Sequence, residues 1–208
     1  YHNIMFALVN KEDNSIVKMY KGNKGVLIGE NQYPQQIFTL WSESERNAID
    51  IYTVEYDNTN LKDVDWYINT NQSYSFDGSK VTASYGTATE KSIADILFSA
   101  QDETDGLGTE GELKSRGLKY KLIEKVKGQA ANELGKTDWY AFRKADAGTA
   151  IPSAVTTHRA AVRTKCGEME TAITNASDLA ALITLYTHTE QEDGTLARPL
   201  GEIPIKYF

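Results

Sequence analysis

The sequence predicts an α+β protein with a β-rich N-terminal part, a helical C-terminal part and an extended tail. Apolar and polar residues alternate over about the first 85 positions, which is typical of strands. Beyond them apolar residues recur every three or four positions, which is typical of helices, and the last segment carries Pro199 and Pro204. We therefore expect a β-rich domain with hairpins at 1–101, a linker at 102–112, a helical hairpin or bundle at 113–190 and an extended tail at 191–208.

Three strands are expected in the first half of the β-rich domain. Ile4–Val9 and Ile16–Tyr20 alternate apolar with polar residues, and the polar turn Asn10–Asn14 joins them. Gly22–Gly29 is rich in glycine and is expected to be a loop. Ile51–Tyr56 is the third strand.

Two local signals organise the rest of this domain. Ser42 with Glu45 has the spacing of a capping box, so a short helix is expected to begin there and to run to about Ile49. Tyr74–Tyr85 reads as a β-hairpin with the Asp77-Gly78 pair at its turn. One face of this hairpin is apolar and therefore has to be covered.

From Thr89 onward the spacing changes to that of helices. A short helix is expected around Ile93–Leu97. The acidic, glycine-containing stretch Asp102–Gly111 is the expected domain boundary. A longer helix is expected at Leu113–Leu134.

The segment Thr137–Pro152 predicts a helix, an elbow and the start of a second helix. Thr137 or Asp138 is expected to cap the first helix with a side-chain oxygen, and Gly148 to end it. Pro152 suits the first turn of the next helix, where its missing N–H is not needed.

The helix after Pro152 carries one apolar stripe, and a last short helix follows it. His158 and Cys166 lie on this stripe, so we interpret His158 as a core or interface residue and Cys166 as a small buried side chain. The remaining apolar positions of the two helices are Val155, Val162, Met169, Ile173, Leu179, Leu182, Ile183 and Tyr186.

Charge and composition exclude several classes of partner. The net charge is −7, and residues 1–105 hold 8 Lys/Arg against 16 Asp/Glu. An acidic surface repels phosphate, so no nucleic-acid partner is expected. No apolar run reaches the ~20 residues of a membrane-spanning helix, so no membrane insertion is expected. The single cysteine, Cys166, forbids an intrachain disulfide.

No motif predicts catalysis, a metal or a cofactor. Gly106–Gly111 matches the G-x-G-x-x-G dinucleotide pattern, but it follows acidic residues instead of a buried strand, so we interpret it as a linker. His188 with the nearby carboxylates, and the stretch Asp57–Asn60, lack the spacing of zinc or calcium sites. We interpret the three tryptophans as core residues and not as interface anchors, on burial preference alone. They are Trp41, Trp66 and Trp139.

Three segments resemble structural proteins of tailed bacteriophages, in particular those from the tail, baseplate and tail-fibre genes of phages of marine bacteria. The segments are Leu40–Asn71, Tyr85–Asp95 and Thr137–Cys166. The third is the most specific, with its Asp-Trp, Arg-Lys and Ile-Pro pairs and its spaced arginines. Similar proteins often read Ile-Gly-Ile where this chain has Asp50 between two isoleucines, which puts the turn geometry there in question.

The resemblance implies a place in a virion tail, in a protein made in the cytoplasm of the host bacterium. We expect a structural subunit at the distal tail, the baseplate or a fibre-attachment point, without enzymatic activity. Its expected partners are other tail proteins and copies of itself, in a symmetric homo-oligomer. A tail-fibre assembly chaperone that is absent from the finished particle is the alternative, and a carbohydrate-active enzyme is a third candidate.

The residues expected at the interface are aromatic or cationic side chains of the elbow and of the apolar tail. Tyr, Trp and Arg are the side chains that most often anchor protein interfaces, and a free apolar tail is costly to expose. These residues are Trp139, Tyr140, Arg143, Tyr207 and Phe208.

Overall fold

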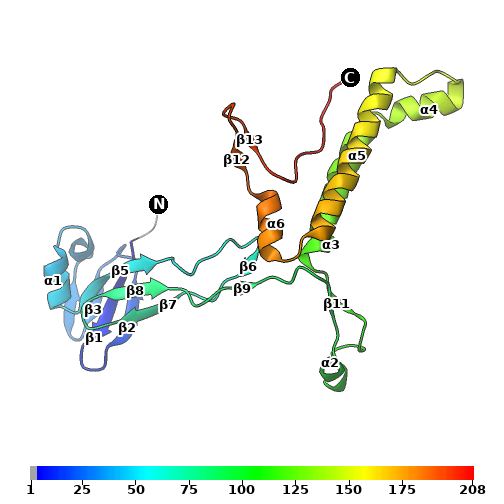
Figure 1. The fold of residues 1–208 in the computed structure, drawn as a ribbon. Coiled ribbons are helices and arrows are strands. Elements are labelled where there is room, and N and C mark those ends of the chain that lie inside the picture. Colours follow the sequence, from blue (N-terminus) through cyan, green and yellow to red (C-terminus); the bar gives the residue numbers. More distant parts are fainter. Residues whose placement is uncertain (1–3) are drawn as a thin grey trace. The chain divides into compact units, whose positions relative to one another are not determined.

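The computed structural model describes residues 4–208 and confirms the α+β class, with strands in the N-terminal part and helices in the C-terminal part (Figure 1). The chain forms two compact units, one ending at Thr89 and the other comprising Glu90–Phe208. The stretch 102–112, expected to be a linker between domains, therefore lies inside the second unit. Two-residue strands are present at Tyr67–Ile68 (β6) and Thr89–Glu90 (β9).

The first unit is built on a five-stranded sheet with the strand order β2-β1-β5-β8-β7. The pair β5–β8 is parallel and the other pairs are antiparallel. The strands are β1 (Phe6–Asn10), β2 (Ser15–Tyr20), β5 (Ile51–Asp57), β7 (Ser73–Phe76) and β8 (Val81–Ser84).

Both predicted hairpins of this unit are present. In the β7–β8 turn the carboxylate of Asp77 accepts hydrogen bonds from the backbone N–H groups of Ser79 and Lys80, at 2.8 and 2.9 Å. These bonds lower the pKa of Asp77 to about 2. Gly78 has a φ of 95°, which is the left-handed conformation that glycine adopts readily. Turn chemistry of this kind is local, which explains why the sequence predicts it.

The predicted glycine-rich loop at 22–29 is wrong in part, because Val26–Ile28 (β3) pairs with Asn31–Tyr33 (β4). Val26 is buried against Phe6, Ile37 and Phe38, and this apolar contact holds the short hairpin in place. Phe38 ends the 3₁₀ helix η1 (Gln35–Phe38). Helix α1 (Glu43–Ala48) follows, with the predicted capping box.

Asp50 has a backbone conformation that glycine adopts more readily than aspartate does. Its φ is 63°, a left-handed conformation that disfavours most side chains. The Asp50 carbonyl accepts a hydrogen bond from the backbone N–H of Val9 at 2.9 Å, and Lys11 Nζ lies 2.7 Å from its carboxylate. The turn therefore keeps a geometry that suits glycine, with an aspartate in it.

The start of the second unit differs from the prediction in two places. The expected helix at 93–97 is wrong, because Ile96–Leu97 (β10) pairs with Leu113–Ser115 (β11). Between these strands Ala100–Thr104 forms helix α2, whose first turn is capped by Ser99 and Asp102. The long helix consequently begins at residue 118 and not at 113.

A pair of antiparallel helices forms the body of the second unit (Figure 1). They are α3 (Leu118–Gly135) and α5 (Ser153–Asn175). Hydrogen bonds join Lys119 to Thr174 at one end and Arg159 to Leu134 at the other, which fixes the antiparallel direction. Helix α4 (Asp138–Ala147) connects the two, and Gly148 ends it with a φ of 66°, as predicted.

The core of this body is the predicted apolar stripe of α5 packed with residues of α3, α6 (Leu179–Tyr186) and the tail. The strand β12 (Thr189–Glu190), just before the tail, pairs with β13 (Leu196–Ala197) of the tail in a small hairpin. The chain then returns to the body, where Leu200 and Ile203 are buried. The other buried apolar residues are Leu118, Val126, Ala130, Val155, Val162, Met169, Ile173, Leu179 and Leu182.

Candidate functional site

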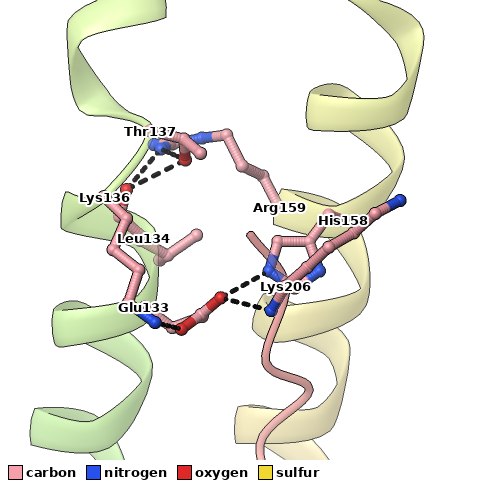
Figure 2. A network of polar contacts seen from close by, with 7 residues as sticks. All are labelled: Glu133, Leu134, Lys136, Thr137, His158, Arg159 and Lys206. Atoms are coloured by element: carbon pink, nitrogen blue, oxygen red, sulfur yellow. Dashed lines mark hydrogen bonds and ion pairs between the residues drawn. The ribbon is translucent and has the colours of Figure 1, made fainter. Parts of the chain in front are cut away.

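The corner between α3 and α4 is held by a side chain of α5 (Figure 2). Arg159 Nη1 donates to the carbonyl oxygen of Leu134 at 2.7 Å and to Thr137 Oγ1 at 2.8 Å. Its Nη2 lies 2.9 Å from the carboxylate of Asp138. The predicted side-chain cap at Thr137 is wrong, because the Thr137 hydroxyl donates back to the Leu134 carbonyl at 3.1 Å. The contacts of Arg159, and not a side-chain cap, therefore hold this corner in place.

One turn before this corner a carboxylate is buried between α3, α5 and the tail. Only 4% of Glu133 is exposed. Its Oε1 lies 2.8 Å from His158 Nε2 and accepts a hydrogen bond from the backbone N–H of Lys206 at 2.9 Å. Its Oε2 accepts a hydrogen bond from the ammonium group of Lys136 (Figure 2). Glu133 thereby fastens the tail to the helix pair.

These partners stabilise the charged form of Glu133. The hydrogen bond from Lys136 lowers its pKa most, and the bonds from Lys206 and His158 lower it further. Burial acts in the opposite direction, and the resulting pKa is about 2. Glu133 is consequently a carboxylate at neutral pH, and a buried carboxylate is tolerated only when it is paired and hydrogen-bonded.

His158 is 7% exposed, which confirms that it lies on the buried side of its helix. Its ring lies 5.4 Å from the ring of Phe208, centroid to centroid. A Glu–His pair can activate a nucleophile, but no hydroxyl or thiol of residues 4–208 is hydrogen-bonded to this pair. Both oxygens of Glu133 are occupied, so the arrangement is that of a structural clamp.

Beside this clamp lies a hollow of about 190 Å³ between the start of α4 and the end of the tail. We call it the aromatic pocket, and its lining residues are Lys136, Trp139, Tyr140, Lys206, Tyr207 and Phe208. The rings of Trp139 and Tyr140 lie 3.8 Å apart, centroid to centroid. Half of Trp139 is exposed, at 49%, as are 51% of Phe208 and 87% of Tyr207.

Cations cover the rings of this pocket. The guanidinium of Arg143 lies 4.7 Å from the centroid of Trp139 and 5.4 Å from that of Tyr140. The Nε atom of Arg143 is buried without a hydrogen-bond partner in the described chain. Lys136 Nζ lies 5.3 Å from the Tyr207 ring and Lys206 Nζ lies 5.2 Å from the Phe208 ring. Contacts of this kind favour a fixed ring orientation.

The five residues expected at an interface therefore lie together, although the tail and α4 are far apart in the sequence. Trp139, Tyr140, Tyr207 and Phe208 line the pocket, and Arg143 stacks on the first two. The interpretation of Trp139 as a core residue is wrong, because Trp139 is half exposed, whereas Trp41 and Trp66 are partly buried.

Sequence reasoning missed Glu133, Lys136 and Lys206. The available signal was Glu133 itself, which stands seven positions after Val126 on the buried face of α3. A charged residue on an apolar stripe needs a partner.

The other candidate motifs have simple structural roles. At Gly108 a side chain would meet the ring of Phe98 at 2.5 Å, so the G-x-G-x-x-G pattern reflects close packing there. Cys166 is half-buried, and its thiol donates to Glu170 Oε1 at 3.2 Å. Burial raises the pKa of this thiol.

No His, Cys, Asp and Glu side chains of the described residues gather in a group of three that could hold a metal ion. None of the helices formed by residues 4–208 combines the length and the apolarity required to cross a bilayer. Comparison with protein-family models, with curated proteins and with solved structures found no match to this chain.

Proposed function

We propose that this protein is a structural subunit of a bacteriophage tail, at the distal tail, the baseplate or a fibre-attachment point, and that it acts by binding its neighbours. The observation that carries the proposal is the aromatic pocket, in which exposed rings and cations from two segments meet on one surface. The resemblance of segments such as Thr137–Cys166 to phage structural proteins supports the location.

The composition of the pocket is that of an interface anchor. Tyr, Trp and Arg dominate the binding energy of protein interfaces, and they do so from pockets that exclude water on binding. Exposed apolar side chains continue beyond the pocket, with Phe142 on α4 and Ile205 in the tail. Exposed apolar side chains next in sequence to Arg143 and Lys206 favour a site of protein interaction at this surface.

The pocket is also held in position before any partner binds. Arg159 fixes the start of α4, and Glu133 fixes the tail through the backbone of Lys206. A surface that is already ordered loses less conformational entropy on binding, which favours affinity. The buried polar contacts beneath the pocket therefore serve binding by keeping the rings in place.

Mass spectrometry of purified virions tests the proposal. A structural subunit is expected in the particle at a fixed ratio to the other tail proteins. If the chain is required for infectious particles but absent from them, the assembly-chaperone alternative replaces the proposal.

A pair of matched variants tests the role of the pocket in the same particles. Trp139→Ala removes a ring of the pocket and is expected to reduce incorporation at least tenfold, since truncating an interface anchor costs about 2 kcal/mol or more. Leu196→Ala removes an exposed apolar side chain of β13, which is not among the residues that line the pocket, and is the control. Equal incorporation of both variants would show that the pocket is not the binding surface.

A further inference from the structure

A second surface of the helical unit has the opposite charge to the aromatic pocket. Residues 96–115, which form β10, α2 and β11, make an acidic lobe whose only cation is Lys114. Its carboxylates are Asp102, Glu103, Asp105, Glu110 and Glu112. Leu107 stands among them with 62% of its surface exposed, between Gly106 and Gly108.

Most charges of the acidic lobe have no ion-pair partner within the described residues. Lys114 Nζ lies 2.6 Å from the carboxylate of Asp102, so the single cation of the lobe is already paired. Asp105 accepts a hydrogen bond from the side chain of Gln101, and Glu103 accepts one from the backbone N–H of Glu110. These neutral bonds leave the negative charges uncompensated.

The aromatic pocket, in contrast, carries cations that have no carboxylate partner within the described part of the chain. Neither Arg143 nor Lys206 forms an ion pair with a carboxylate of residues 4–208; both lie over aromatic rings instead. A ligand that combines a small apolar group with flanking carboxylates would satisfy these cations and fill the hollow.

The acidic lobe offers that combination, and it cannot reach the pocket of its own chain. The lobe ends at Ser115, just before α3 begins, whereas the pocket starts at Lys136, just after α3 ends. A helix of 18 residues spans about 27 Å at 1.5 Å per residue. The two complementary surfaces are therefore at opposite ends of one rigid rod, an arrangement that suits contact between two copies.

We infer that copies of this protein join head to tail, with the acidic lobe of one copy seated on the aromatic pocket of the next. Leu107 enters the hollow, and Asp105 and Glu110 face Arg143 and Lys206. The hollow of about 190 Å³ is roughly six times the ~30 Å³ of one liquid water, which is room for a four-carbon side chain.

Such a contact is heterologous, so it repeats into a closed ring or a filament. This inference rests on the proposed function and identifies the partner of the pocket as a second copy of the same chain.

Charge reversal tests the inference by sedimentation velocity of the purified full chain. The pocket variant carries Arg143→Glu and Lys206→Glu, and the lobe variant carries Asp105→Lys and Glu110→Lys. The wild-type chain is expected to self-associate, more weakly as salt is raised from 50 to 500 mM, because exposed charges are screened. Each variant alone is expected to weaken self-association at least tenfold, since the substituted residues then carry the same charge as the residues that they face on the next copy.

An equimolar mixture of the two variants is the decisive sample. In the mixture each variant supplies a surface that complements the other, so association is expected to return. Lys121→Glu with Lys125→Glu, on exposed positions of α3, makes the same charge change elsewhere and is expected to associate like the wild type. Leu107→Asp, at an exposed tip, is expected to abolish association without lowering the melting temperature.

Three results would overturn the inference: a monomeric wild type, variants that associate like the wild type, or a mixture that stays monomeric. An acidic segment of a different tail protein would then be the occupant of the pocket. The proposed function fails by a separate result, the absence of the chain from purified virions, so the two failures are distinguishable.

Discussion

Replacing Glu133 by glutamine is expected to loosen the tail from the helix pair. The change keeps the shape of the side chain and removes its charge. Glutamine still accepts at one oxygen, but its amide group is a donor. Either Lys136 alone, or His158 and Lys206 together, then lose their acceptor. The perturbation is therefore confined to the clamp beneath the aromatic pocket.

The size of the effect follows from the partners of Glu133. Hydrogen bonds to a charged group contribute about 1.5–3 kcal/mol each, and leaving a buried partner unsatisfied costs about 1–3 kcal/mol. The bond from Lys136 counts for less, about 1 kcal/mol at most, because Lys136 is half exposed. We expect a loss of about 3 kcal/mol in the free energy of unfolding, or roughly 10 °C in the Tm of a unit of this size.

Urea unfolding followed by helical circular dichroism measures this loss, and hydrogen exchange reports on the tail. The backbone N–H of Lys206 is expected to exchange faster in the variant, because its acceptor is the Glu133 carboxylate. Glu124→Gln, on an exposed position of the same helix, is the control and is expected to change stability by less than about 0.5 kcal/mol. A Glu133 variant as stable as this control, with an unchanged exchange rate at Lys206, would refute the clamp.

Three further outcomes are expected. Ser42→Ala removes the capping box of α1 and is expected to cost about 1 kcal/mol in urea unfolding of the first unit, whereas an unchanged midpoint would contradict the role of the cap. Gly117→Ala, at the N-cap of α3, places a Cβ 2.3 Å from a backbone carbonyl carbon and is expected to cost about 1–3 kcal/mol. Gly128→Ala, inside α3 with open space around it, is expected to stabilise by up to about 1 kcal/mol, and the opposite order of the two melting temperatures would show the packing argument wrong. Glu133 and Asp102 both have a pKa of about 2 in the folded chain, below the ordinary values of 4.5 and 3.8. Their contribution to stability is therefore full above about pH 5 and is lost as the pH falls toward 2. Equal urea midpoints of the second unit at pH 6 and pH 3 would count against this.

The elements that the sequence predicts are those specified by neighbouring residues. Ser42 and Glu45 are three positions apart and form their capping box, and the Asp77-Gly78 pair makes its own turn. Gly148 ends α4 and Pro152 precedes α5 for reasons that lie in their own backbones. Each signal lies within one turn of the structure that it determines.

The elements that the sequence misses depend on a partner elsewhere. Ile96–Leu97 has no strand signal of its own, and it becomes a strand because Leu113–Ser115 lies beside it. The capping pair Ser99 and Asp102 was a usable signal for α2, since it repeats the spacing seen at Ser42. The acidic composition of the surrounding stretch favoured a linker in its place.

The candidate site also has one part that local sequence predicts and one part that depends on distant residues. The interface residues were predicted from their chemistry, because Trp, Tyr and Arg are enriched among the residues that dominate the binding energy of interfaces. The sequence does not predict that these residues meet in one pocket. Their meeting requires the tail to return to α3 through a hydrogen bond between Lys206 and Glu133, 73 positions apart. No local pattern encodes a contact over that separation.

The grip of Arg159 on the corner between α3 and α4 has a consequence for the order of events during synthesis. Leu134 and Thr137 leave the ribosome more than twenty residues before the side chain that fixes them. Until α5 has been made and has paired with α3, α4 has only its own short-range bonds to direct it. The direction of α4, and with it the shape of the pocket, is therefore acquired late, when α5 closes the hairpin.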